Sequence, residues 1–299
     1  PNTPIITVCA TFSSACSGTS RGARSARCLQ STSHGEHVSM NHSPPLTRRL
    51  LGFVKELVDS YNQTTSHLHY GQVARDLWIP SMAATLPATA RVLDVGAGEG
   101  RYKADFSHCE YKAQDFAQYD SSNSGIDADS WTYGEIDYVC DITDIPVAAG
   151  SFDDVICTEV LEHVIEPIRA IKEMARVLVP GGSLYLSAPM RSGVHQAPHH
   201  YYGGFTPYFY QEILPRYGQS VDSTTAPGGL FRAFQEEGQR VAAECLATRA
   251  THRDRDRDDI LSHLINFVLL ILFPYVFTKL DDQQKLDRFA AGWHVEATK

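Results

Sequence analysis

The segment Val92–Gly100, with the sequence VLDVGAGEG, has the residue types and spacing of a binding site. An apolar run leads into Gly96, Gly98 and Gly100, so the turn that follows can bring its backbone against a ligand where a β-carbon would collide. The dinucleotide fingerprint is G-x-G-x-x-G, whereas the glycines here alternate and Asp94 precedes the first of them by two positions. A carboxylate there would repel a phosphate and would suit an ammonium group. The pattern therefore disfavours a nicotinamide-dependent oxidoreductase.

Two more acidic residues lie at the end of a predicted strand or directly after one. Asp115 lies 21 residues after Asp94, close to the spacing of about 20 at which a carboxylate binds ribose hydroxyls. Asp141 and Ile142 follow an apolar stretch and would supply an acceptor for an adenine amino group and an apolar face for its ring. An amino-acid end, a ribose and an adenine together suggest S-adenosylmethionine.

Alternating strand and helix patterns must position these residues. A helix is predicted from about Glu166 to Leu178, with Pro167 in its first turn. One or two helices are predicted between Leu46 and Leu86, and another from about Leu230 to Ala250. Repeated strand–helix units favour a parallel sheet with helices on both faces and ligands at the carboxyl ends of the strands. The predicted strands are 91–95, 111–116, 138–140, 154–158, 183–188 and a last one at 292–299.

In this order, the motifs resemble those of the class I S-adenosylmethionine-dependent methyltransferases, most closely their small-molecule, type 11-like branch. The resemblance covers roughly residues 65–220 and implies a Rossmann-like α/β fold. That fold is a seven-stranded, mostly parallel sheet with helices on both faces, here with a helical insertion before the last strand. It also implies methyl transfer to a small-molecule acceptor, with a hydroxyl as the expected target. The motifs that carry the resemblance are Asp94–Gly100, Asp115, 140–142, 151–155, 161–163 and 176–182.

By this resemblance, the methionine end of the cofactor would lie at Asp94, the ribose at Asp115, the adenine at Asp141, and the sulfonium near Glu159. Gln114 departs from the family pattern before Asp115 and weakens the ribose assignment. Each position also has a purely structural interpretation. The glycines could form a tight turn only, Asp115 could be a helix cap, Asp141 a turn residue and Glu159 a surface charge. The full predicted cofactor set is Asp94, Gly96, Gly98, Gly100, Asp115, Phe116, Asp141, Ile142 and Glu159.

The segment 191–206, rich in histidine and tyrosine, lies where this fold places contacts to the acceptor. His195 or His199 is predicted to act as a general base for a hydroxyl acceptor, since a histidine titrates near neutral pH. The alternative is a loop anchored by aromatic packing, and His163 is interpreted as a packed or helix-start histidine. No metal site is predicted, because Pro198, His199 and His200 have no carboxylate or cysteine at ligand spacing.

Composition limits the partners. The 299 residues carry 26 basic and 35 acidic side chains, a net charge of −9, which argues against a nucleic-acid-binding surface. Seven scattered cysteines without a C-x-x-C pair favour a reducing, cytoplasmic compartment. Residues 1–45, rich in Ser, Thr and Arg, are predicted to be a disordered or non-native leader.

The remainder is predicted to form a methyltransferase core, 46–229 with 290–299, interrupted by a helical insertion at 230–289. Its apolar block, Ile260–Phe277, has 18 residues, a length at the lower limit for crossing a bilayer of about 30 Å. A last strand that returns to the sheet disfavours a true span. A buried lid, a homodimer helix and a membrane-surface element remain open. For the whole chain, the alternative to an enzyme is a non-catalytic partner or regulator that binds S-adenosylmethionine.

Overall fold

The computed structural model describes residues 52–53, 55, 70–120, 132–250, 261 and 264–299. One compact unit runs from Leu46 to Lys299. The leader expected at residues 1–45 and most of the helical pattern expected at 46–69 lie outside the described residues.

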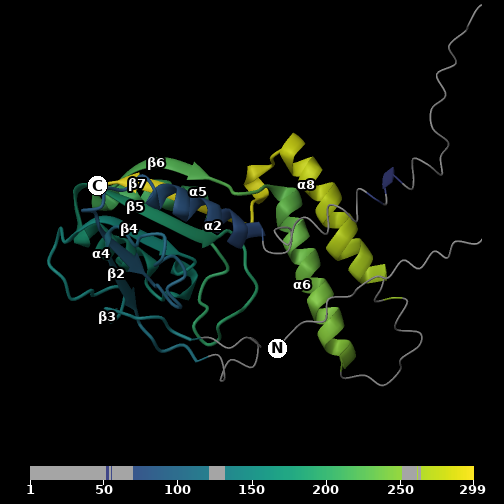
Figure 1. Ribbon diagram of the computed structural model, residues 1–299, viewed down its shortest axis with the longest axis horizontal. Helices are drawn as coiled ribbons and strands as arrows, with labels where there is room; N and C mark the ends of the chain where they lie inside the picture. The colour runs from purple at the N-terminus through teal and green to yellow at the C-terminus, as the bar shows by residue number, and fades with distance from the viewer. Residues whose placement is uncertain (1–51, 54, 56–69, 121–131, 251–260, 262–263) are drawn as a thin grey trace, which may run out of the picture. The chain divides into compact units, whose positions relative to one another are not determined.

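A seven-stranded sheet in the order β3-β2-β1-β4-β5-β7-β6 forms the centre of this unit (Figure 1). The pairs formed by β1 to β5 are parallel, whereas β7 runs antiparallel to both of its neighbours, β5 and β6. The expected seven-stranded, mostly parallel sheet is therefore confirmed. The strands are β1 (Arg91–Val95), β2 (Glu110–Asp115), β3 (Tyr138–Val139), β4 (Phe152–Thr158), β5 (Leu178–Pro189), β6 (Ser220–Thr225) and β7 (Gly292–Thr298).

Strand β6 is the one whose position the sequence did not predict. Its residues, SVDSTT, include no run of large apolar side chains, and none of its six residues is buried. It pairs only with β7, at the edge of the sheet. An edge strand can be polar because its outer side faces solvent.

The longest helix, α6, lies in the segment between β6 and β7. That segment holds α6, which agrees with the expected helix at 230–250, and then η4, α8 and η5. In Figure 1, α6 and α8 run side by side, and Phe231 packs on Phe277 with ring centroids 5.9 Å apart. The helices are α2 (Tyr70–Ala83), η2 (Leu161–His163), α4 (Pro167–Val177), α5 (Pro207–Ile213), η3 (Leu214–Tyr217), α6 (Leu230–Ala250), η4 (Phe267–Leu272), α8 (Phe273–Gln283) and η5 (Asp287–Phe289).

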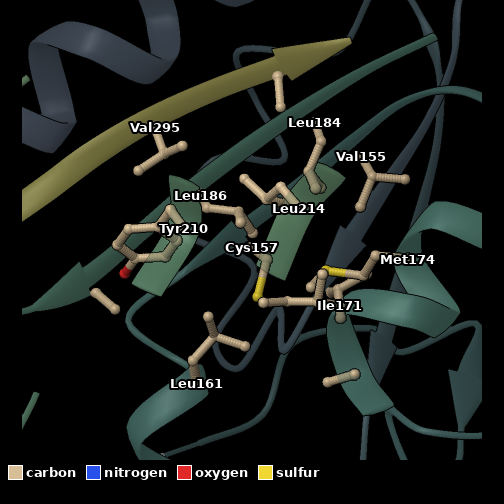
Figure 2. Packing of buried hydrophobic residues seen from close by; sticks show 14 of the residues in the cluster. Val155, Cys157, Leu161, Ile171, Met174, Leu184, Leu186, Tyr210, Leu214 and Val295 are labelled. Atoms are coloured by element: carbon tan, nitrogen blue, oxygen red, sulfur yellow. The ribbon is translucent and has the colours of Figure 1, made fainter. Parts of the chain in front are cut away.

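The sheet is buried on both faces, so its central strands are apolar at successive positions. On one face Val92 and Ile156 pack with Ile79 of α2. On the other face α4 and α5 cover a larger cluster, in which Cys157 and Met174 are fully buried (Figure 2). Because side chains alternate along a strand, Asp94 shares the α2-facing side of β1 with Val92. A carboxylate is thereby placed at the end of a buried strand, next to a turn.

Candidate active site

A glycine turn follows β1 directly. Gly96 has φ +71° and Gly98 has φ +54°, both in the left-handed region that favours glycine. A β-carbon on Gly96 would lie 2.4 Å from Cγ2 of Val160, so no larger residue fits there. Gly96 and Gly98 line the cavity described below. Gly100 does not line the cavity. Gly134 packs against the turn near Gly100, and its N–H donates a 3.0 Å hydrogen bond to the Gly98 carbonyl.

Asp94 is 3% exposed, and its Oδ2 accepts a 2.6 Å hydrogen bond from the hydroxyl of Tyr111. Burial raises the pKa of Asp94 to about 7, and the nearby Asp115 adds to this rise. No cationic side chain is recorded as its partner among the described residues. A cationic ligand group next to Asp94 would favour the ionised carboxylate.

Asp115, at the end of β2, is held by the glycine turn. Its two oxygens accept 2.9 Å hydrogen bonds from the backbone N–H groups of Gly98 and Ala117. Burial raises the pKa of Asp115, and these two donors oppose that effect. Each carboxylate oxygen retains acceptor capacity, so hydroxyl groups of a ligand can still donate to Asp115.

Gln114, the departure from the family pattern, has a structural role. Its Oε1 accepts from the Gly96 N–H at 3.3 Å, and its Nε2 donates to the Cys140 carbonyl at 2.7 Å. The side chain thereby ties the turn after β1 to the end of β3. It supports the position of Asp115 without replacing it.

Beyond β3, Asp141 is exposed and lines the cavity. Its Oδ1 accepts from both the N–H and the hydroxyl of Thr143, at 2.8 and 2.7 Å, which is a turn geometry typical of aspartate. The other oxygen, Oδ2, is recorded in no hydrogen bond among the described residues. Ile142 and Phe116 line the same part of the cavity and offer apolar surface.

Glu159 follows β4 with φ +55° and also lines the cavity. Its Oε1 accepts a 2.8 Å hydrogen bond from Ser187 and lies 3.3 Å from Nη1 of Arg75. Arg75 comes from α2, and no sequence pattern marked it as part of the site. The ion pair excludes the interpretation of Glu159 as an isolated surface charge.

Three histidine rings, those of His163, His195 and His200, cluster on the acceptor side. His195 Nδ1 lies 2.9 Å from the Gly193 carbonyl, and His163 Nδ1 lies 2.7 Å from the His199 carbonyl. A carbonyl only accepts, so both Nδ1 atoms carry a proton, and in the neutral rings both Nε2 atoms have a free lone pair. The rings of His163 and His195 meet edge to face at 4.7 Å, and His200 lies 4.6 Å from His195. The rings of His199 and Phe116 meet edge to face with centroids 5.1 Å apart, on the cofactor side.

A carboxylate joins this histidine cluster from η2. Glu162 is 1% exposed, its Oε2 has no recorded partner, and its Oε1 lies 3.7 Å from His163 Nε2. Burial raises the pKa of Glu162 well above its usual range, whereas burial lowers the pKa of His163 to about 4, so this contact joins two neutral groups. One ligand atom from each of Glu162, His163 and His195 lies within 4.8 Å of the others, so the three could hold a metal ion. Ligand spacing along the chain gave no sign of this set.

The predicted cofactor residues other than Gly100 line one cavity of about 1130 Å³, together with Arg75, Glu162, His163, His195 and His199. One wall is the row of turns after the strands, and the opposite wall is formed by α2 and α6. The two helices are joined there, since the Gly71 N–H at the start of α2 donates to Glu236 over 2.7 Å, and Arg232 stacks on the ring of Tyr70. The α6 residues were not predicted as part of the site, because only the tertiary fold brings them there.

Taken together, the strand order, the glycine turn and the acids at successive strand ends define a class I S-adenosylmethionine-dependent methyltransferase domain. Residues 93–186 match the family described as "Methyltransferase domain". The matched residues carry the methyltransferase domain, and a helical segment lies between the last two strands of the sheet.

Among curated proteins, a ubiquinone biosynthesis O-methyltransferase of Xanthomonas axonopodis pv. citri (strain 306) is 38% identical over 117 residues, covering 36% of this chain and 46% of that protein. A demethylmenaquinone methyltransferase of Renibacterium salmoninarum is 31% identical over 133 residues, covering 44% and 55%. The solved phosphoethanolamine N-methyltransferase 2 of Haemonchus contortus has a TM-score of 0.42 and 17% identity, covering 75% and 51%. The chain thus spans about half the length of the curated relatives it matches.

The residues present fit S-adenosylmethionine. The buried carboxylate of Asp94 has no recorded cationic partner and suits an ammonium group, and Asp115 retains capacity for ribose hydroxyls. Asp141 and Ile142 offer an acceptor and an apolar face at the far end of the same wall. Gly96 leaves no room for a side chain in the turn.

Proposed function

We propose that the protein transfers a methyl group from S-adenosylmethionine to a hydroxyl of a small molecule. The observation that carries this proposal is the position of His195, in the same cavity as Asp94, Asp115 and Asp141 and with one ring nitrogen free to accept a proton. The two kinds of group form a cofactor side and an acceptor side of one cavity.

When bound, S-adenosylmethionine would supply a methyl group carried on a sulfonium, and the sulfur would leave as a neutral thioether when the acceptor oxygen takes the methyl group. The residues of this chain have to align the two reactants and exclude water. The Gly193 carbonyl fixes the ring of His195, so that Nε2 accepts the proton of the acceptor hydroxyl. His199 packs against Phe116, and we assign it the boundary between acceptor and cofactor.

The names of the matched relatives favour quinone-related ring compounds as acceptors. Sugars, natural products and lipid-linked hydroxyls are the wider class from which the acceptor is drawn. We place the enzyme in the cytoplasm, with its cavity accessible to small molecules. The non-catalytic alternative predicts cofactor binding without any methylated product.

The test uses the full chain, S-adenosylmethionine labelled in its methyl group, and small-molecule extracts divided into water-soluble and lipid fractions. We expect label in one fraction with the wild type. The His195→Ala variant should lose about 10²- to 10⁴-fold in rate, the usual contribution of a general base, while binding S-adenosylhomocysteine normally. His108→Ala is the matched control, because His108 is exposed and lies outside the cavity. Cofactor binding without a labelled product in either fraction would favour the binding protein.

A divalent cation at Glu162, His163 and His195 would engage the same nitrogen of His195, so the base and metal roles exclude each other. Chelation separates them. With His195 as the base, dialysis against EDTA leaves the rate unchanged. A loss of activity that a divalent cation restores would instead assign His195 to metal binding.

A further inference from the structure

The helix that continues from η4 into α8, Leu264–Gln283, is long and apolar enough to cross a membrane. Between Leu264 and Thr278 it contains no charged residue. Only 11% of its most apolar 18-residue window is buried inside the protein. Within the part of the chain that the structure describes, this stretch is the one with that combination of length, apolarity and exposure.

The exposed apolar surface extends around the helix. Each of the seven consecutive residues 267–273, with the sequence FVLLILF, is at least partly exposed. Residues 267–272 form a π-helix, and seven consecutive residues make more than one full turn, so they point to every side. On one side the helix packs on α6, where Phe231 lies against Phe277 with ring centroids 5.9 Å apart. A partner helix would cover one further stripe, whereas acyl chains contact every part of an embedded helix that the protein leaves uncovered. The width of the exposed apolar surface therefore indicates lipid.

The neighbouring helix α6 adds to this surface and limits its depth. Phe234 and Val241, seven residues apart on α6, are 54% and 53% exposed, which extends the apolar surface. The other side of α6 carries Glu236 and Arg240, which line the cavity. Charged groups are costly in hydrocarbon, so α6 belongs at the membrane surface and not within it.

The sheet excludes a single crossing. Strands β6 and β7 pair with each other, and the helical segment lies between them in the chain. Both ends of the segment must therefore lie on the same side of a membrane, and α6 is too polar to form the second span. A helix that lies in the interface, with its apolar side chains in the acyl region, satisfies both conditions.

We propose that the η4–α8 helix inserts into one leaflet of a lipid bilayer and holds the α6 wall of the cavity at the membrane surface. This inference does not depend on methyl transfer. Because the chain has a net charge of −9, insertion and not attraction to anionic headgroups supplies the affinity. Binding should therefore occur on zwitterionic lipid and persist in high salt.

The test is flotation of the full chain with phosphatidylcholine vesicles and, separately, with vesicles containing phosphatidylglycerol. We expect the protein to float with both, in low salt and in 1 M NaCl alike. The double variant Leu264→Ser/Phe267→Ser, at positions 56% and 44% exposed, should lower the partition coefficient about a hundredfold, as expected for two apolar side chains that no longer insert. Calorimetry with S-adenosylhomocysteine verifies that this variant keeps its fold.

The matched control is Val139→Ser, an equally apolar and 65% exposed position on β3, which should float like the wild type. Failure to float with either vesicle would overturn the proposal, and so would release by salt, which would indicate headgroup attraction. A dimer in solution that does not bind vesicles and dissociates in the double variant would assign the helix to a second copy of this chain.

Discussion

Asp115 is the residue at which the proposed cofactor site can be perturbed with a calculable effect. Its carboxylate accepts the N–H groups of Gly98 and Ala117, and it is 6% exposed. Asp115→Ala leaves the buried Gly98 N–H without its partner, which should destabilise the fold by about 1–3 kcal/mol. The same change removes hydrogen bonds between a charged acceptor and the ribose. These are worth about 1.5–3 kcal/mol, or roughly a 10- to 150-fold weaker affinity for S-adenosylhomocysteine.

A second carboxylate, Asp137, separates the two effects. Its oxygens accept from the Ala113 N–H at 2.9 Å and from Lys112 Nζ at 2.6 Å, so it also ties down backbone, but it does not line the cavity. Asp137→Ala should therefore destabilise the fold without changing the affinity. The assays are isothermal calorimetry with S-adenosylhomocysteine and urea unfolding, on both variants and the wild type. If folded Asp115→Ala binds within about twofold of the wild type, Asp115 is not the ribose ligand.

Three further predictions concern the turn, a buried histidine and the metal question. Gly96→Ala places a methyl group 2.4 Å from Val160 at φ +71°, so we expect a lower unfolding midpoint and weaker S-adenosylhomocysteine binding; wild-type values for both would contradict the tight turn. Burial lowers the pKa of His294 from 6.5 to about 4. Between these two pH values the unfolded chain binds a proton that the native state excludes. The stability present above pH 6.5 is therefore lost as the pH falls towards 4. That difference is worth up to about 3 kcal/mol, and His294→Phe, which keeps an aromatic ring against Trp78, should lose less stability between pH 7 and 4. If the wild type and His294→Phe give parallel curves of unfolding free energy against pH, this prediction for His294 is wrong. EDTA should leave the methyl-transfer rate unchanged, as measured with labelled cofactor, and a loss of rate would reassign His195.

The sequence predicted those parts of the site that depend on local pattern. Asp94 and Asp141 follow short apolar runs, whereas Asp115 was placed by its spacing of 21 residues from Asp94. Parallel strands bring their carboxyl ends to one edge of the sheet, so these positions could be inferred from the strand pattern, that spacing and the family resemblance. The helix expected at 230–250 was found as α6 (Leu230–Ala250).

The parts that sequence reasoning missed depend on contacts between distant segments. Glu162 and His195 meet because η2 and the loop after β5 follow adjacent strands, although more than thirty residues separate them in the chain. Arg75 reaches Glu159 only because α2 packs across the end of the sheet. Strand β6 is polar and pairs through its backbone, so its side chains gave no periodic signal.

The central claim is that the turns after β1, β2 and β3 bind S-adenosylmethionine. Isothermal calorimetry of the full wild-type chain, titrated with S-adenosylhomocysteine and in parallel with NAD, tests it most directly. The geometry of Asp94, Asp115 and Asp141 predicts saturable one-to-one binding of S-adenosylhomocysteine and no heat from NAD. Saturable binding of NAD without binding of S-adenosylhomocysteine would contradict the account.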